Sequence, residues 1–249
     1  MRRFTVFVEG VLPTVGEVVA LPPDASRHLV AVLRARRGDG VTLLNGTGSA
    51  YSASVTEASA QAALLTITGA LTTQPPPRLT LVQAVTKGKT MDEIVQNATA
   101  IGVGRIVPVL SRHCEVKLDA AKALARQAQW LRAATEACKQ SGNPWRPEVS
   151  RPLGIQEWLQ RLEGMQTRIV ASLQPDALQV GEVARQLPPD SEPILLVGPE
   201  GDFSAEEYAE IDRLGFVPAR LGPHVLRSEL AATVLLSIIS GLRATPADA

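Results

Sequence analysis

Apolar residues recur in two different rhythms along this chain. In residues 1–73, short apolar runs are separated by turn signals such as Arg37-Gly38-Asp39-Gly40 and Asn45-Gly46-Thr47-Gly48, which is typical of strands joined by tight turns. One helix is expected over residues 25–34, with Asp24 as its N-cap. Several short strands with a single helix favour a small β-barrel. The expected strands are 4–8, 17–20, 40–44, 50–55 and 63–68.

Beyond residue 77 the pattern alternates between strands and helices. Ile194-Leu195-Leu196-Val197 is apolar without alternation, which predicts a strand buried on both faces. Capping boxes are expected where Thr90 precedes Glu93 and where Ser204 precedes Glu207. The β-α-β order implies a mostly parallel sheet covered by helices. The expected strands are 79–85, 105–110, 167–172, 193–197 and 217–221, and the expected helices are 90–101, 119–140, 155–162, 204–214 and 228–243.

Three successive prolines, residues 75–77, mark the change of rhythm. They cannot join a helix or a central strand, and they form a short, stiff spacer. We therefore expect one domain over residues 1–73 and a second over residues 77–249. Within the second domain, the long helix is expected to bury a stripe made of Leu124, Leu131 and Cys138.

Charge and cysteine content exclude several classes of protein. The 249 residues carry no net charge, so any contact with nucleic acid must come from a local patch. Cys114 and Cys138 form no disulfide framework, and His113 beside Cys114 lacks a second ligand pair at zinc spacing, so no metal is expected. Glu9 and Gly10 interrupt the first apolar run, and residues 230–242 are too short to span a bilayer. A soluble cytoplasmic protein is expected.

Two glycine-containing loops near the C-terminus are the main candidates for chemistry. Gly-Pro-Glu-Gly-Asp-Phe occupies 198–203, and Leu-Gly-Pro-His-Val-Leu-Arg-Ser-Glu occupies 221–229. Each follows a strand-like run and precedes a helix, and such units form pockets at the carboxyl ends of parallel strands. The Gly-x-Gly-x-x-Gly fingerprint of dinucleotide-binding proteins is absent. A P-loop is also absent, because residues 87–90 reverse the order that it requires. The sequence predicts a small-molecule site, with ordinary tight turns as the alternative.

Positive charge gathers locally in the first domain. Five basic side chains share the small helix and its exit turn: Arg27, His28, Arg34, Arg36 and Arg37. On a chain without net charge this cluster indicates phosphate contacts, and a solvated face is the alternative. Lys87, Lys89, Arg112 and Lys117 extend the positive charge into the second domain.

In this order the motifs resemble those of the ribosomal small-subunit methyltransferase E family, which belongs to the SPOUT class of RNA methyltransferases. The resemblance covers nearly the whole chain. Its first-domain motifs are Arg3-Phe4, His28-Leu29, Val32-Leu33-Arg34 and Gly38-Asp39, and its second-domain motifs are Lys87, Lys89, Gly102-Val103, Glu136-Ala137, Gln140-Ser141-Gly142 and the two C-terminal loops. The chain departs from the family pattern at Asp202, where glycine is usual, and at His224, where arginine is usual.

The resemblance implies an α/β fold: a C-terminal SPOUT-type domain with a trefoil knot, preceded by a PUA-like β-barrel that binds RNA. It implies methyl transfer from S-adenosylmethionine to N3 of a uridine in 16S rRNA of the small ribosomal subunit. It also implies a homodimer through the knotted domains, which agrees with a last helix apolar nearly all round; a buried helix in a monomer is the alternative. The rival functions are methylation of another RNA base and non-catalytic RNA binding during ribosome assembly.

The resemblance further implies two sets of binding residues. S-adenosylmethionine is expected at Leu173, Gly198, Pro199, Glu200, Gly201, Leu221, Gly222, Val225 and Leu226. RNA is expected at Arg3, Arg27, His28, Arg34, Arg36, Arg37, Lys87 and Lys89.

Three charged side chains are the candidates for catalysis. Arg227 is expected to stabilise negative charge that develops on the uracil oxygens, and Glu229 or Glu200 to accept the proton from N3. Each also has a structural interpretation. Glu229 favours the dipole in the first turn of a helix, Glu200 accepts backbone N–H groups within its own loop, and Arg227 forms an ion pair.

Overall fold

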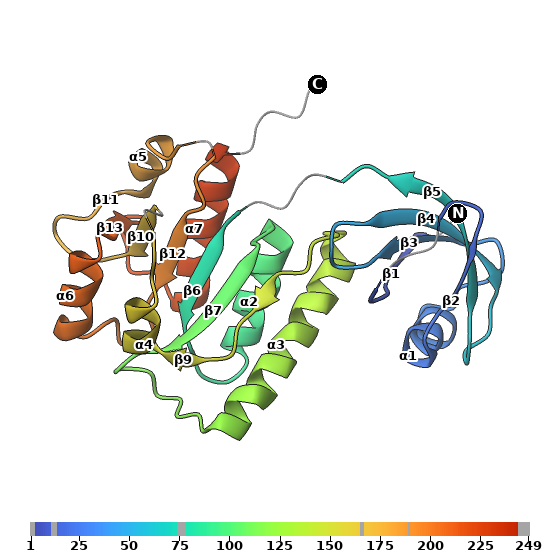
Figure 1. Cartoon of the computed structure of the whole chain (residues 1–249), viewed down its shortest axis with the longest axis horizontal. Coiled ribbons are helices and arrows are strands. Elements are labelled where there is room, and N and C mark those ends of the chain that lie inside the picture. The colour runs from blue at the N-terminus through green and yellow to red at the C-terminus, as the bar shows by residue number, and fades with distance from the viewer. Residues whose placement is uncertain (1–2, 11–13, 74–77, 165–166, 189, 244–249) are drawn as a thin grey trace. The chain divides into compact units, whose positions relative to one another are not determined.

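The computed structural model describes residues 3–10, 14–73, 78–164, 167–188 and 190–243, and Figure 1 shows the order of their elements. The chain divides into two compact units. The first consists of Met1–Pro76 with Thr135–Arg146, and the second of Pro77–Ala134 with Pro147–Ala249. The expected proline spacer at 75–77 lies outside the described residues, and the inclusion of a later segment in the first unit was not predicted.

The first unit contains a five-stranded sheet in the order β1-β3-β4-β5-β2. Strands β1 and β3 are parallel, and the other neighbours are antiparallel. Alternate side chains, such as Val41 and Leu43 on β3 and Leu65 and Ile67 on β5, point into a core around Leu29. The expected strands are confirmed: β1 (Arg3–Phe7), β2 (Val18–Ala20), β3 (Gly40–Leu44), β4 (Ala50–Glu57) and β5 (Leu64–Leu71).

The helix of this unit differs from the expected one. Helix α1 (Pro23–Arg27) has Pro22 at its N-cap, without a side-chain cap, so Asp24 lies in the first turn instead. Proline suits the first helical turn, where its missing N–H is not needed. The chain then forms a π-helical turn, η1 (His28–Val32), and Arg34 adopts a left-handed conformation with φ 57°.

The second unit is built on an eight-stranded parallel sheet in the order β11-β13-β10-β12-β6-β7-β8, with β9 also pairing with β7. The expected parallel sheet is confirmed, although the two-residue strands β8, β9 and β11 are too short to be detected from sequence. The strands are β6 (Thr80–Ala84), β7 (Arg105–Leu110), β8 (Glu148–Val149), β9 (Leu153–Gly154), β10 (Arg168–Ala171), β11 (Leu178–Gln179), β12 (Ile194–Val197) and β13 (Val217–Arg220).

Helices cover both faces of this sheet (Figure 1). Leu81 and Leu195 belong to one core with α2, α5 and α7, whereas Val82 and Leu196 belong to a second core with α4 and α6. This explains why the central strands are apolar without alternation. The helices are α2 (Thr90–Ile101), α3 (Ala120–Ser141), α4 (Ile155–Gln160), α5 (Val180–Arg185), α6 (Ala205–Arg213) and α7 (Ser228–Arg243), of which α5 was not predicted.

Two expectations about these helices are wrong in detail. Helix α2 has Lys89 at its N-cap and no side-chain cap, so Thr90 and Glu93 form no capping box. On α3, Cys138 is buried and Leu131 packs partly buried against the core, as expected, but Leu124 is 52% exposed and Trp130 is buried. Ala123, Trp130 and Ala137, which are also spaced by seven, are all buried. The buried stripe therefore runs one position earlier than expected, and Leu124 lies beside it.

Within the described residues, no helix is both long enough and apolar enough to cross a membrane. The trefoil threading of the C-terminal segment stays a prediction.

Candidate functional site

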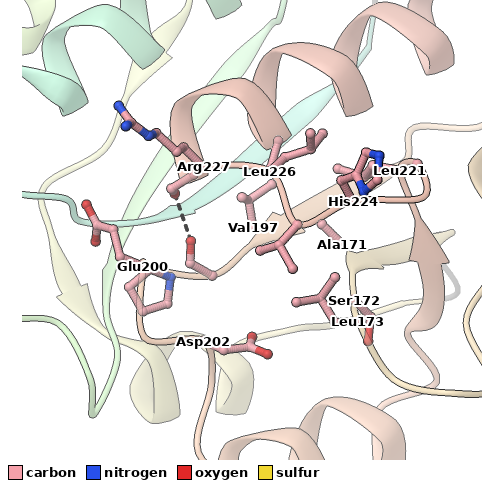
Figure 2. Close-up of a pocket in the computed structure, with 16 residues that line it drawn as sticks. Ala171, Ser172, Leu173, Val197, Glu200, Asp202, Leu221, His224, Leu226 and Arg227 are labelled. Carbon is pink, nitrogen blue, oxygen red and sulfur yellow. Dashed lines mark hydrogen bonds between the residues drawn. The ribbon is translucent and has the colours of Figure 1, made fainter.

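A cavity of about 280 Å³ lies where β10, β12 and β13 end. These strands are neighbours in one parallel sheet, so the loops that follow them meet at the same edge, as ligand-binding loops do in open α/β sheets. Residues 171–173 follow β10, residues 197–202 follow β12, and residues 221–228 follow β13; all three segments contribute lining residues (Figure 2).

The structure brings most of the expected cofactor residues together. Those that line the cavity are Leu173, Gly198, Pro199, Glu200, Leu221, Gly222, Val225 and Leu226. Gly201 is not among the lining residues. The cavity also has lining residues that sequence reasoning did not assign to it: Ala171, Ser172, Val197, Asp202, His224, Ser228 and Ala231. Ala171 and Val197 are the last residues of β10 and β12, and Ser172 directly follows β10. Asp202 and His224 lie within the two predicted loops, and Ser228 and Ala231 lie in the first turns of α7, so their places next to these loops are the signal that would have found them.

Apolar side chains contribute to the lining of this cavity. Of these, Val197 is buried, whereas Val225 is 75% exposed. Gly222 lines the cavity, and a Cβ placed there would have no atom within 4 Å. A concave, mostly apolar site with a few polar groups is the usual form of a small-molecule site.

A buried hydrogen-bond chain fixes the first glycine loop to the last helix. The amide nitrogen of Gln83 donates to the Ser228 hydroxyl at 2.9 Å, and that hydroxyl donates to the carbonyl oxygen of Gly198 at 2.8 Å. Gln83 and Ser228 are both buried. The chain therefore joins β6, α7 and the loop after β12 at the edge of the cavity.

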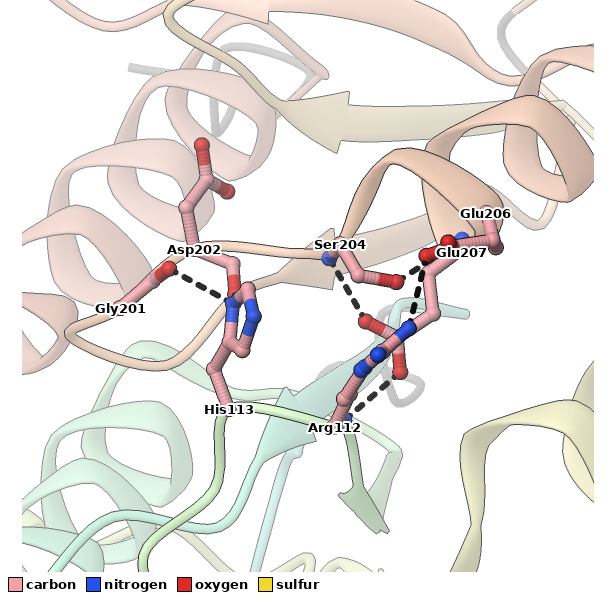
Figure 3. Close-up of polar contacts among 7 residues, drawn as sticks. All are labelled: Arg112, His113, Gly201, Asp202, Ser204, Glu206 and Glu207. Carbon is pink, nitrogen blue, oxygen red and sulfur yellow. Dashed lines mark hydrogen bonds and ion pairs between the residues drawn. The ribbon is translucent and has the colours of Figure 1, made fainter.

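The segment after β7 holds the same loop from outside the cavity (Figure 3). The Nδ1 atom of His113 lies 3.0 Å from the carbonyl oxygens of both Gly201 and Asp202. Because carbonyl oxygens only accept, Nδ1 carries the hydrogen in this arrangement. A Cβ on Gly201 would lie 3.1 Å from the His113 Cβ, so glycine permits this close approach.

The loop ends in the capping box that the sequence predicted. The Glu207 backbone N–H donates to the Ser204 hydroxyl at 3.3 Å, and the Ser204 N–H donates to the Glu207 carboxylate at 2.8 Å. The other carboxylate oxygen of Glu207 accepts the Arg112 backbone N–H at 2.8 Å. This buried carboxylate therefore joins the loop after β7 to the start of α6.

Asp202 and Tyr208 form the remaining polar contact of the loop. The Tyr208 hydroxyl donates to the Asp202 carboxylate at 2.8 Å, and the Tyr208 ring meets the Phe203 ring edge-on at 5.7 Å. Burial and the neighbouring carboxylate raise the pKa of Tyr208 well above its usual value. Tyr208 therefore stays protonated and donates its hydroxyl hydrogen to Asp202.

The three candidate catalytic residues do not all reach the cavity. Arg227 and Glu200 are exposed and belong to its lining. Glu229 is half-buried in the first turn of α7 and is not a lining residue.

The expected RNA-contacting residues are exposed where their side chains are described. In the first unit these are Arg27, His28, Arg34, Arg36 and Arg37, and in the second they are Lys87 and Lys89. Arg27 lies 4.0 Å from Asp24, and Lys87 forms an ion pair with Glu115. Arg3 lies in β1.

Comparison with known proteins defines the class first. A family model described as an RNA methyltransferase domain matches residues 73–240, and one described as an RNA methyltransferase PUA domain matches residues 21–68. The fold class expected from sequence, a small PUA-like β domain followed by an α/β methyltransferase domain, is thereby confirmed.

Individual relatives narrow the class. Ribosomal RNA small subunit methyltransferase E from Aquifex aeolicus is 33% identical over 66% of this chain and 69% of its own, and that from Synechocystis is 29% identical over 90% and 73%. The enzyme of the same name from Neisseria gonorrhoeae, solved bound to S-adenosyl methionine, superimposes with a TM-score of 0.86 at 30% identity over 97% of this chain and 98% of its own. A Legionella pneumophila protein in complex with the same cofactor gives 0.84 at 30% identity over the same shares. The chain belongs to the ribosomal RNA small subunit methyltransferase E family.

Proposed function

We propose that this chain transfers the methyl group of S-adenosylmethionine to N3 of a uridine in 16S rRNA of the small ribosomal subunit. The observation that carries the proposal is the cavity where the loops after β10, β12 and β13 meet, in a family whose relatives were crystallised with this cofactor. The cytoplasm, where ribosomes assemble, is the proposed place of action.

The cavity has the chemistry that an adenosyl cofactor requires. Ala171, Val197 and Leu226 offer apolar surface for an adenine ring, while the backbone at Gly198 and Gly222 offers polar groups at close range. Its volume of about 280 Å³ is close to the lower end of the usual range for ligand sites, about 300–1,000 Å³.

In this proposal, Arg227 acts on the base that receives the methyl group. S-adenosylmethionine supplies an electrophilic methyl when bound, and the chain must hold N3 in line with it, which contributes at most about 7–11 kcal/mol to catalysis. The guanidinium of Arg227 has no hydrogen bond or ion pair within the described chain, and the residue lines the cavity. It is therefore available to stabilise negative charge on the uracil oxygens.

Glu200 is the proton acceptor that the cavity favours. It lines the cavity and is exposed, whereas Glu229 lies outside the lining, in a helical turn where its charge favours the dipole. A carboxylate within reach of N3 contributes about 10²–10⁴-fold as a general base. Glu229 remains the second candidate.

We propose that the basic cluster of the first unit contacts RNA phosphates. It occupies α1, the π-helical turn η1 and the turn around Arg34, whose φ is 57°; single π-helical turns and left-handed residues occur often at functional sites. Replacing Arg34 and Arg36 together should weaken RNA binding and lower the salt slope by about one unit per lost contact. A salt slope equal to the wild-type value would mean that these arginines face solvent and do not contact phosphates.

The proposed domain limits are residues 1–73 for RNA binding and 77–249 for methyl transfer.

We also propose a homodimer that uses α7. Leu230 and Leu242 are exposed on this helix, and a second copy offers an apolar partner for them in a two-fold interface. Light scattering of the wild type and of Leu230→Arg tests this, with a monomer expected only for the variant.

Mass spectrometry of rRNA nucleosides is the experiment that tests the function. Small-subunit rRNA from a strain lacking the gene should lose 3-methyluridine, and the wild-type gene should restore it while Arg227→Ala should not. Retention of 3-methyluridine with loss of another methylated base would favour a different RNA substrate. Failure of the purified chain to bind S-adenosylmethionine in calorimetry would favour a non-catalytic assembly factor.

A further inference from the structure

Asp202 has a backbone conformation that few side chains adopt. Its φ is 59°, in the left-handed region where glycine fits freely and other residues are strained, although aspartate and asparagine tolerate it better than most. The surrounding structure holds this conformation: the Asp202 N–H donates to the carbonyl oxygen of Pro199 at 3.0 Å, and His113 binds the Asp202 carbonyl. Backbone strain kept in place at a cavity is a sign of function.

The carboxylate of Asp202 uses only one of its oxygens inside the protein. Oδ1 accepts the Phe203 N–H and the Tyr208 hydroxyl, each at 2.8 Å. A Cβ on Gly198 would lie 3.3 Å from this oxygen, so the carboxylate rests against the first residue of the loop. For Oδ2, the described chain offers no hydrogen-bond donor. The side chain is therefore fixed in direction and keeps acceptor capacity free.

The free oxygen belongs to the cavity. Asp202 is a lining residue, and Figure 2 shows its carboxylate directed toward Ser172 and Leu173, at the end of β10. Glu200 and Arg227 extend to the opposite side of the same view. The cavity thus has two separate polar regions, with the apolar residues Ala171 and Val197 also in its lining.

We propose that Asp202 binds the ribose hydroxyls of the adenosyl cofactor, an inference that rests on the proposed function. If Arg227 and Glu200 act on the target base, the reacting methyl end of the cofactor lies on their side, and Asp202 faces the other part of the ligand. There the base lies against apolar residues, and the sugar attached to it is the next group that presents hydrogen-bond donors. A carboxylate that accepts from ribose hydroxyls is an established way to bind nucleosides.

Tyr208 is a positioning residue in this arrangement. It does not line the cavity, but its hydroxyl holds Oδ1 and so directs Oδ2 toward the ligand. Tyr208→Phe should keep the apolar and ring contacts with Phe203 while releasing the carboxylate. Its effect on ligand affinity should be smaller than that of Asp202→Gly, and specific to ligands that carry the ribose hydroxyl bound by Asp202.

Calorimetry with the full chain tests the proposal through binding alone. The probes are S-adenosylhomocysteine, its 2′-deoxy and 3′-deoxy forms, and 5′-methylthioadenosine, which lacks the amino acid. The main variant is Asp202→Gly, because glycine adopts a φ of 59° without strain. Asp176→Gly, which makes the same change at an exposed aspartate that does not line the cavity, is the matched control.

The wild type should bind at least one deoxy form about tenfold or more weakly than S-adenosylhomocysteine, as expected for a lost hydrogen bond to a charged group. Asp202→Gly should bind the deoxy and ribose forms alike, and Asp176→Gly should keep the wild-type ratio of the two affinities. Equal discrimination by the wild type and Asp202→Gly overturns the proposal. The proposal also fails if Asp202→Gly loses affinity for S-adenosylhomocysteine but not for 5′-methylthioadenosine. The carboxylate would then bind the ammonium group of the amino acid, which only S-adenosylhomocysteine carries. If the wild type binds none of these probes, the proposed function itself fails.

Discussion

The two glycine loops that border the cavity are held in different ways. The first, residues 198–203, is fixed by Ser228, His113 and Tyr208. In the second, no described residue forms a hydrogen bond with residues 222–226, and Val225 is 75% exposed. The two loops line one cavity with very different numbers of polar restraints.

This contrast indicates a division of labour between the loops. A loop held by many hydrogen bonds presents its backbone groups to a ligand with little further loss of entropy. A loop without such restraints adjusts to the ligand and covers it, and local opening of this kind is typical of binding loops. We therefore expect residues 198–203 to determine where a ligand binds, and residues 222–226 to order around it.

A bulky residue at position 222 should have the largest effect on binding. A Cβ at Gly222 meets nothing within 4 Å, whereas one at Gly198 lies 3.3 Å from atoms of Asp202 and Phe203. Gly222→Phe should thus abolish calorimetric binding of S-adenosylhomocysteine by filling the cavity, with the melting temperature unchanged. Gly198→Ala should weaken binding and also lower the melting temperature, because the first loop has no room for the added methyl group. Normal binding by Gly222→Phe would contradict the assignment of the cavity.

Loss of the Arg227 side chain should have the next largest effect, and only on turnover. If its charge acts on the base as it becomes anionic, Arg227→Ala should lower kcat by about 10²–10³-fold and leave the affinity for S-adenosylhomocysteine nearly intact. Glu200→Gln should also lower kcat and alter its pH dependence, whereas Glu229→Gln, outside the lining, should do neither. The reverse result would make Glu229 the proton acceptor. Loss of cofactor binding in Arg227→Ala would mean that this arginine orders the second loop instead.

Sequence reasoning located both loops because their signals are local. A buried strand, a glycine loop and a capping residue follow one another within a few positions at Ser204 and Glu207, and the structure contains that capping box. The same reasoning failed at Thr90, which has the residues of a capping box but is the first residue inside the helix. Local pattern cannot fix a helix start to one residue.

The supports of the first loop were not predictable, because they come from distant parts of the chain. His113 is separated from Gly201 by 88 positions, and Gln83 from Ser228 by 145. Only the order of strands in the sheet, with β6 beside both β12 and β7, brings these side chains to one loop. The pairing of a His113-Cys114 dipeptide with this loop has no signature in the sequence itself.

Replacing Glu207, which caps the end of the first loop, should lower the stability of the protein. Glu207→Ala removes the acceptor for the backbone N–H groups of Arg112 and Ser204 and breaks the capping box, which should reduce the free energy of unfolding by about 2 kcal/mol or more. Urea denaturation measures this change. Glu207→Gln keeps an acceptor oxygen and should cost less. Equal, negligible effects of both variants would contradict the idea that the first loop depends on these bonds.

The smallest effect is expected from His113→Ala. This change removes the bond from Nδ1 to the carbonyl oxygens of Gly201 and Asp202, and an exposed hydrogen bond of this kind contributes about 0.5–1.5 kcal/mol. The dissociation constant for S-adenosylhomocysteine should therefore rise about two- to tenfold.

Arg112→Ala is the matched control for that measurement. It removes the neighbouring side chain, whose exposed ion pair with Glu206 contributes about 0–1 kcal/mol, and keeps the backbone N–H that binds Glu207. His113→Ala should raise the dissociation constant while Arg112→Ala leaves it near the wild-type value, because only His113 touches the loop at the cavity. A dissociation constant near the wild-type value for both variants would show that the loop keeps its shape without His113. The first loop would then be held by its hydrogen bonds to Ser228 and Tyr208, which are both buried.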